Sequence, residues 1–424
     1  MKLKILIVPA IAVMFSYGSE AQIYDTNGDY VQTFAGSGEV GYLDGQGQLT
    51  KFSSPSQIVA DTSSNLYVWD SGNYLIRKIT PDGTVSTLAG GGTASTGWGT
   101  NVLLIGQSAV EAGVSISMAI DHSNTIWFLV GPASGFAYLL NISTNGYVSV
   151  KNTHLPGWSV PLGSICFDSA NNLYYSGGNL IYRYNPNTGI SQPFAGNGTP
   201  GYVDGNGTIW PEFNSPASLA CDEANNIYVW DSGNYVIRRL DQSQNVTTIA
   251  GKYSGVDVDG VGTNAAFIAT AFPSMFSDDA GNIYFACYTC IRKMNAQTNV
   301  VTMAGSFTQS GYNNGAGNLA LFSGAIGACI SGGTIYIADH VNERIRDITF
   351  NPQPQVVTGA NLGIGTFAGV TITGAVGRTY QIQTSPDFNT WTTKTTLLLN
   401  SSPYLWIDQS PVSGNKFYRA LMLP

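Results

Sequence analysis

The chain has 424 residues, of which 43% are hydrophobic and 12% aromatic, so it can bury a large core. Only 10% of the residues are charged, and the formal net charge is -8 with no Lys/Arg cluster beyond the first residues, which argues against a nucleic-acid partner. The 50 Gly and 23 Tyr residues favour many short strands joined by tight turns, and therefore an all-β fold.

The first 21 residues have the composition of an export signal. Lys2 and Lys4 precede an apolar run over residues 5–15, and Ser19 and Ala21 supply the small side chains of a cleavage site. The run is too short to be a permanent membrane-spanning helix. We expect a mature chain that starts near Gln22, has no transmembrane segment, and is extracellular, bound at the cell surface or periplasmic.

One stretch, residues 55–90, returns in altered form at residues 216–251. Turn-forming residues divide it, including Asp61 and the Pro81-Asp82-Gly83 sequence, in which Pro presets φ and Gly accepts a positive φ. The predicted strands cover residues 57–60, 66–69, 75–79 and 85–89. One repeat is therefore a four-stranded antiparallel meander, with its second strand covered on both faces.

The repeat occurs six times. Ala-Gly pairs end the fourth strand at Gly36, Gly90, Gly196, Gly251 and Gly305. The long interval between Gly90 and Gly196 holds two repeats, one of which has lost its Ala-Gly pair. The last repeat, residues 324–350, has three strands, and residues 29–35 match its missing fourth strand. The simplest account is a ring of six sheets closed by the N-terminal strand, which removes exposed sheet edges.

The sequences NLYVWDSGNYLIRKI and TIYIADHVNERIRDI resemble the NHL repeat, and the Gly-Tyr-x-Asp-Gly-x-Gly linkers are similar to those of extracellular bacterial members. The resemblance covers residues 28–350 and implies a six-bladed β-propeller over residues 22–350. It says little about function, because one fold supports many activities.

The repeat ends before a linker at residues 351–358. Residues 359–424 alternate apolar and polar side chains between Gly- and Pro-containing turns, which predicts a small antiparallel, sandwich-like β-domain. This part resembles the C-terminal modules appended to many secreted bacterial proteins.

In such a ring, the loops that join fourth to first strands and second to third strands lie on one face. We call it the long-loop face, because it holds nearly all the long loops, and functional residues tend to lie on loops that a rigid scaffold holds. The candidate ligand-binding residues are Tyr42, Asp44, Trp98, Tyr202, Asp204, Asp257, Asp259 and Tyr312. The carboxylates of the repeated loop motif, at Asp44, Asp204 and Asp259, could bind calcium or sugar hydroxyls, but each lacks the second and third oxygen ligands of a calcium loop, which favours a turn-forming role and no metal or cofactor.

Two repeated sets favour structural roles. Asp70, Asp231 and Asp339 end second strands and Arg77, Arg238, Arg292 and Arg346 lie in third strands, as expected of structural ion pairs. First strands line the axis of the ring, where the predicted channel residues are Gln57, Ser117, Ser164, Ser218 and Ser274. These could hold a ligand, but small side chains are also what the close approach of six strands requires.

The five cysteines suggest one disulfide. Cys166 and Cys329 occupy the same position in opposite sheets, too far apart to bond, and Cys221 fits a buried thiol. Cys287 and Cys290 flank a shortened turn, where a disulfide is plausible in an exported protein.

Two functions stay open. The first is a non-enzymatic recognition module that binds a protein or glycan through the long-loop face. The alternative is a propeller hydrolase, lactonase or lyase that uses carboxylates and a divalent metal at the mouth of the axis. Its candidates are the non-repeated Glu111, Glu212, Asp257 and Glu343.

Overall fold

The computed structural model divides the chain into two units, residues 1–353 and 354–424. In the first it describes residues 22–25, 29–90, 115–131, 137–144, 146–156, 163–206, 210–268 and 274–350. In the second it describes residues 368–372, 378–386, 389–398, 404–408 and 417–423. The expected export signal, residues 1–21, and Trp98 and Glu111 lie outside these ranges.

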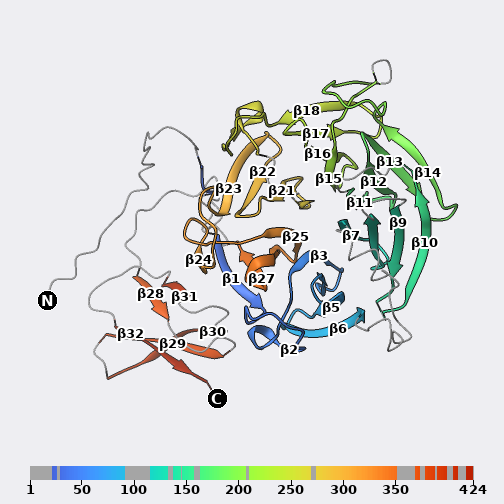
Figure 1. Cartoon of the computed structure of the whole chain (residues 1–424). Helices are drawn as coiled ribbons and strands as arrows, with labels where there is room; N and C mark the ends of the chain where they lie inside the picture. The colour runs from blue at the N-terminus through green and yellow to red at the C-terminus, as the bar shows by residue number, and fades with distance from the viewer. Residues whose placement is uncertain are drawn as a thin grey trace. The chain divides into compact units, whose positions relative to one another are not determined.

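The described residues of the first unit form six antiparallel sheets, or blades, arranged in a ring (Figure 1). Blade 1 consists of β3 (Pro55–Ala60), β4 (Leu66–Asp70), β5 (Leu75–Ile79) and β6 (Thr84–Gly90). Blade 2 consists of β7 (Ser115–Ile120), β8 (Ile126–Gly131), β9 (Ala137–Ile142) and β10 (Val148–Leu155). Blade 3 consists of β11 (Ile165–Phe167), β12 (Leu173–Gly177), β13 (Leu180–Asn185) and β14 (Ile190–Ala195).

The other three blades follow the same order. Blade 4 consists of β15 (Pro216–Cys221), β16 (Ile227–Asp231), β17 (Val236–Leu240) and β18 (Val246–Ala250). Blade 5 consists of β20 (Met275–Ser277), β21 (Ile283–Ala286), β22 (Cys290–Met294) and β23 (Asn299–Gly305). Blade 6 consists of β25 (Ala325–Ser331), β26 (Thr334–Asp339), β27 (Arg344–Thr349) and the N-terminal β1 (Tyr30–Ala35).

The ring closes at both its axis and its rim. Each first strand contacts the first strand of the next blade, from β3 through β7, β11, β15, β20 and β25 back to β3. At the rim, β1 pairs with β27 over more than 300 residues of sequence, with Tyr30 opposite Thr349 and Gln32 opposite Asp347. The predicted all-β propeller closed by an N-terminal strand is confirmed.

The core lies between neighbouring blades. All five residues of β4 are buried, which confirms that the second strand is covered on both faces. Tyr67 and Trp69 of that strand pack against Met118 and Phe128 of blade 2, and equivalent clusters fill the other boundaries. Burial of these aromatic and aliphatic side chains is the main stabilising contribution to the fold.

The glycine-rich linkers cover the outer edges of the blades that follow them. Short strands β2 (Gly45–Gln46), β19 (Gly260–Val261) and β24 (Gly315–Ala316) pair with the outermost strands β6, β23 and β1. Gly45 and Gly315 have φ values of 149° and 142°, which L side chains rarely adopt. The connection into blade 3 is too short for this motif, and β14 instead contains Pro193, which has no N–H to offer a further strand.

The second unit contains the expected antiparallel strands. In one sheet, β29 (Thr379–Ser385) lies between β30 (Thr392–Leu398) and β32 (Phe417–Met422). In the other, β28 (Ala368–Ile372) pairs with β31 (Tyr404–Asp408). Within the described parts of both units, no helix has the length and apolar character needed to cross a membrane.

Candidate functional site

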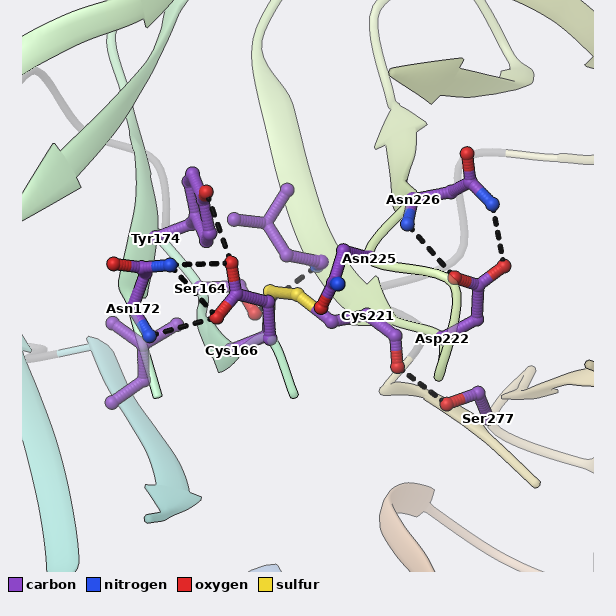
Figure 2. The surroundings of a disulfide bond; sticks show 12 residues. Ser164, Cys166, Asn172, Tyr174, Cys221, Asp222, Asn225, Asn226 and Ser277 are labelled. Atoms are coloured by element: carbon purple, nitrogen blue, oxygen red, sulfur yellow. Dashed lines mark hydrogen bonds between the residues drawn. A yellow bond between two sulfur atoms is a disulfide. The ribbon is translucent and has the colours of Figure 1, made fainter. Parts of the chain in front are cut away.

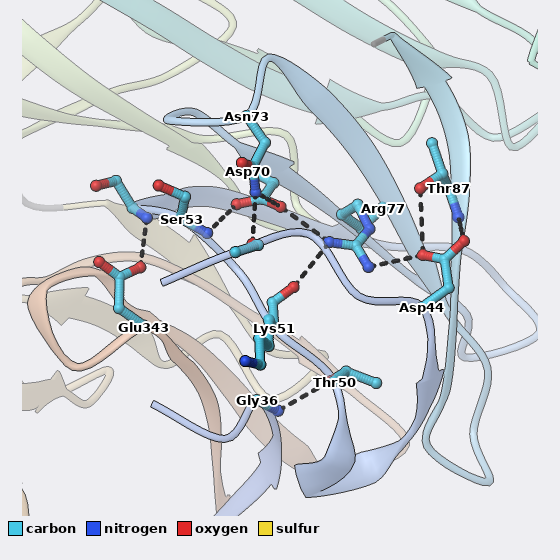
Figure 3. A network of polar contacts seen from close by, with 12 residues as sticks. Gly36, Asp44, Thr50, Lys51, Ser53, Asp70, Asn73, Arg77, Thr87 and Glu343 are labelled. Carbon is cyan, nitrogen blue, oxygen red and sulfur yellow. Dashed lines mark hydrogen bonds and ion pairs between the residues drawn. The ribbon is translucent and has the colours of Figure 1, made fainter. Parts of the chain in front are cut away.

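An arginine lies buried within blade 1, beside the long-loop face (Figure 3). Nη1 of Arg77 donates to Oδ2 of Asp70 at 2.9 Å, and both side chains are fully buried. Asp70 also accepts from the backbone N–H of Ser53 (2.6 Å) and from Nδ2 of Asn73 (2.7 Å). Burial raises the pKa of Asp70, although these hydrogen bonds and the guanidinium oppose the rise.

The same pair recurs in two other blades. Arg238 contacts Asp231 and Arg346 contacts Asp339, each at 2.8 Å. The prediction of repeated structural ion pairs is confirmed. In blade 5 the residue after β21 is Cys287, at the position of Asp70, and the loop residues Asp257 and Asp259 provide the carboxylates for Arg292 instead, at 3.1 and 2.9 Å.

Three of the candidate loop carboxylates reach into this arrangement. Asp44 accepts from Nη2 of Arg77 (2.7 Å) and from the backbone N–H of Thr87 in β6 (3.0 Å). Asp204 makes the same contacts with Arg238 and Thr248, and Asp259 makes them with Arg292 and Thr302. The loop motif therefore anchors each linker to the blade that follows, a role that the spacing of the glycines did not indicate.

The candidate tyrosines differ in exposure. The Arg346 guanidinium lies 4.9 Å from the ring centroid of Tyr312, and that of Arg238 lies 5.4 Å from the ring of Tyr202. Tyr312 is 42% exposed, Tyr202 55%, and Tyr42 74%. The rings of Tyr202 and Tyr312 are thus held at one side by a buried arginine and present the rest of their surface to solvent.

Further large apolar side chains are exposed in the same loops. They include Val40, Leu43, Trp210 and Tyr253 of the linkers, and Tyr74 and Val341 of the β4–β5 and β26–β27 turns. Tyr253 packs against Tyr235 of the β16–β17 turn, with ring centroids 4.6 Å apart. Exposed aromatic and aliphatic groups thus occur in several loops of the long-loop face, and ion pairs anchor the linkers that carry Tyr42 and Tyr202.

The predicted channel serines join the blades to one another. Oγ of Ser117 accepts from the backbone N–H of Ile165 in the next blade at 3.2 Å. The same bond runs from Leu219 to Ser164 (3.2 Å), from Met275 to Ser218 (3.1 Å) and from Ala328 to Ser274 (3.3 Å). At the sixth position is Gly327, where an added Cβ would lie 2.0 Å from the backbone oxygen of Ser56. Gln57 and Ser274 help to line an axial cavity of about 270 Å³.

The disulfide lies elsewhere than expected (Figure 2). Cys166 of β11 and Cys221 of β15 are bonded, with their Cα atoms 6.2 Å apart. Cys287 and Cys290, the predicted pair, are free thiols, and the backbone N–H of Cys287 donates to the carbonyl of Cys290 across their turn. When the repeats are aligned, Cys221 lies one position after the one that Cys166 occupies in blade 3. The first strands β11 and β15 are nevertheless neighbours, and they bring the two side chains together.

The non-repeated carboxylates have separate partners. Glu212 accepts from Nδ2 of Asn197 (3.1 Å), Asp257 pairs with Arg292, and Glu343 accepts from the backbone N–H of Ser54. In the described ranges of the chain, no three His, Cys, Asp or Glu side chains form a group that could hold a metal ion.

Comparison with known proteins assigns this arrangement to the β-propellers. No family model matches the chain. Solved structures that resemble it come from Bacteroides thetaiotaomicron, a structural-genomics protein of unknown function (19% identity, TM-score 0.58) and an auxiliary nutrient binding protein (19%, 0.56), and from Bacteroides ovatus, another auxiliary nutrient binding protein (16%, 0.55). In each case 76% of either chain is covered. At these identities the likeness shows the fold and not the type of repeat or the activity.

A curated sequence relative is also found. The chloroplastic protein Suppressor of Quenching 1 of Arabidopsis thaliana is 27% identical over 334 residues. The match covers 74% of this chain and 27% of the plant protein, so the chain spans about a quarter of that relative's length.

Proposed function

We propose that this protein is an exported, non-enzymatic recognition module that binds a protein or glycan partner through its long-loop face. The observation that carries the proposal is the gathering of exposed aromatic and aliphatic side chains in the loops of that face, including Tyr42, Tyr202, Trp210 and Tyr253. Aromatic side chains supply much of the binding energy at protein interfaces and offer flat apolar surfaces.

The anchoring of the loops supports the same role. A loop that is ordered before binding loses less conformational entropy when it contacts a partner. Asp44 and Asp204 tie their linkers to the buried arginines Arg77 and Arg238, so the tyrosines two residues earlier are presented by a preorganised backbone. This arrangement suits recognition by shape and apolar contact.

The hydrolase, lactonase or lyase alternative requires unlike carboxylates to converge on one metal at the axial mouth. Glu212, Asp257 and Glu343 instead contact Asn197, Arg292 and the Ser54 N–H, respectively. Calcium at Asp44 or Asp204 would have to compete with a guanidinium already 2.7–2.8 Å away. We therefore favour recognition over metal-dependent catalysis.

Two further observations agree with a binding role outside the cytoplasm. Two of the structures of the same fold are described as auxiliary nutrient binding proteins. The N-terminal 21 residues have the composition of an export signal. We propose an extracellular, cell-surface or periplasmic location. We also propose that the propeller is of the NHL type, on the residues of blades 1 and 6.

The test is a thermal-shift screen of the mature chain against glycans and divalent metals, since a ligand of the native state raises the melting temperature. Hits are then titrated calorimetrically into Tyr42→Ser, Trp210→Ser and Tyr253→Ser variants. Tyr147→Ser, at an equally exposed turn on the opposite face, is the matched control.

We expect the loop variants to weaken binding at least about tenfold, the loss expected for an interfacial aromatic, and the control to bind normally. Binding that is lost only in the control, or turnover of ester or lactone substrates that depends on Glu212 or Asp257, would overturn the proposal.

A further inference from the structure

The segment Gln22–Asp25 docks on the outer edge of blade 5 as an added parallel strand. The backbone N–H of Thr302 in β23 donates to the carbonyl of Ile23 (2.9 Å), and the N–H of Asp25 donates to the carbonyl of Thr302 (2.8 Å). The N–H of Ile23 donates to Oδ2 of Asp259 at 2.7 Å. The segment thus uses both the strand edge and the loop carboxylate.

Side chains of the segment reach one further point on the edge. Tyr24 Oη and Gln22 Nε2 both donate to the carbonyl of Gly305, at 2.7 and 3.2 Å. This is the glycine of the Ala-Gly pair that ends the strand. The docked segment therefore makes hydrogen bonds with an aspartate carboxylate, a threonine backbone and a glycine carbonyl of one blade.

Blades 1 and 4 carry the same three groups. In blade 1 they are Asp44, Thr87 and Gly90. Asp44 accepts hydrogen bonds from Arg77 and Thr87 (Figure 3). Asp259 accepts the same bonds from Arg292 and Thr302. In blade 4 the three groups are Asp204, Thr248 and Gly251. The backbone that surrounds them has the same bulge, since Arg77 pairs with Thr87, Arg238 with Thr248 and Arg292 with Thr302.

Among the described residues, exposure distinguishes the edge that Gln22–Asp25 occupies from the other two. The side chain of Asp259 is fully buried, whereas those of Asp44 and Asp204 are 48% and 49% exposed. Thr302 is fully buried, while Thr87 is exposed and Thr248 half-buried. In blade 6 the corresponding Thr33 carbonyl accepts from Nε2 of Gln48, so that edge is used by the chain itself.

We propose that the outer edges of blades 1 and 4, at Asp44–Thr87 and Asp204–Thr248, are docking sites for an extended polypeptide segment of a partner protein. The segment adds a parallel strand, directs one backbone N–H at the aspartate, and exchanges the next carbonyl and N–H with the threonine. A hydroxyl or amide side chain like those of Tyr24 and Gln22 then reaches the glycine carbonyl.

This inference rests on the proposed recognition role, for which it names an extended peptide as the partner. It places the contact at the rim carboxylates rather than at the exposed aromatics. The N-methyl peptide described below tests the rim contact without altering the loops, so failure of peptide binding at the rim can be told apart from failure of binding through Tyr42, Trp210 and Tyr253.

The probe is a fluorescein-labelled peptide, Gly-Gly-Gln-Ile-Tyr-Asp-Gly-Gly, titrated with the mature full chain by fluorescence polarisation. Asp44→Asn and Asp204→Asn are combined in one variant. Asn is a suitable replacement because Asn314 occupies this position in blade 6 and binds Arg346 through Oδ1 at 2.7 Å. Asp82→Asn, in the β5–β6 turn of blade 1, is the control, and circular dichroism verifies that each variant folds.

We expect saturable binding that the double variant weakens at least about tenfold, the effect of losing a charge-assisted hydrogen bond. Methylation of the isoleucine nitrogen of the peptide removes the donated N–H and should weaken binding by a similar factor. The proposal is overturned if the wild-type chain shows no saturable binding, or if the double variant or the N-methyl peptide binds as the parent pair does.

Discussion

Ser117 of blade 2 and Ile165 of blade 3 are joined by a side-chain-to-backbone hydrogen bond across the blade boundary. Ser117 is 9% exposed, so its replacement by Ala leaves the Ile165 N–H without its acceptor in a largely buried place. We expect Ser117→Ala, and likewise Ser218→Ala, to lower the free energy of unfolding by about 1–3 kcal/mol. Urea denaturation provides the measurement, with the exposed Ser86→Ala as control. Variants as stable as the wild type would mean that water replaces the serine.

The disulfide leads to a prediction about reducing agents. Removing a native disulfide typically costs about 2–4 kcal/mol. Because Cys166 and Cys221 join blades 3 and 4, dithiothreitol should lower the melting temperature of the wild type and of the Cys287→Ser variant. It should leave a Cys166→Ser/Cys221→Ser variant unchanged. A response that follows Cys287 would contradict the assigned connectivity.

One substitution in blade 6 should create the loop ion pair that blades 1 and 4 have between Asp44 and Arg77 and between Asp204 and Arg238. Asn314 stands where they have Asp44 and Asp204, and its Oδ1 already lies 2.7 Å from Nη2 of Arg346. Asn314→Asp should therefore fold normally and gain about 0.2–1 kcal/mol, the range of an exposed pair. Differential scanning calorimetry at low and high salt measures this gain, which salt should reduce. Asn313→Asp is the neighbouring control, from which no comparable gain is expected.

Two buried carboxylates flank the closing strand. Burial, followed by the charge of Asp25, raises the pKa of Asp29 to about 7, against the opposing charge of Lys293. Burial also raises the pKa of Asp347 to about 6, although Gln32 and Arg346 oppose the rise. Asp29 directly precedes β1, and Asp347 lies opposite Gln32 within the β1–β27 pair.

The sign of the pH effect follows from these pKa values. At Asp29 and Asp347 the folded protein keeps protons that the unfolded chain releases near pH 4, so these two groups should lower the free energy of unfolding as pH rises from about 4 to about 7. Urea midpoints measured across this range should show the decline. Asp29→Asn should reduce the decline of the urea midpoint between about pH 4 and 7, and Asp347→Asn should reduce it between about pH 4 and 6. A wild-type midpoint that rises with pH while the variants stay flat would refute the assignment.

Sequence periodicity predicted the blades because each repeat brings its own turn chemistry and buried second strand. It also predicted closure, since residues 29–35 have the pattern of a fourth strand without the three strands before it. The Asp70–Arg77 pair followed from repetition of its two residue types. Each of these features is encoded within a single repeat.

Contacts between blades were harder to foresee. Cys166 and Cys221 occupy positions that are one residue apart when their repeats are aligned. Their disulfide therefore depends on how neighbouring first strands are staggered, which a single repeat does not encode. The serines were recognised as a ring, but their acceptance of an N–H from the next blade depends on the same stagger. The role of Asp44 was missed because its partner Arg77 lies across the linker in the following blade. A signal was present, in that loop aspartates and third-strand arginines occur together in blades 1, 4 and 5.

The pairing of Tyr30 with Thr349 also has a kinetic consequence. During synthesis β1 leaves the ribosome before the other strands of the propeller, but β27, the strand that pairs with it, is the last of them to appear. Contacts of such high sequence separation form slowly because a long loop must close before they contribute stability. Until then both β1 and the edge of β27 are open to other chains, so the interval before closure is when this protein is most exposed to misassembly.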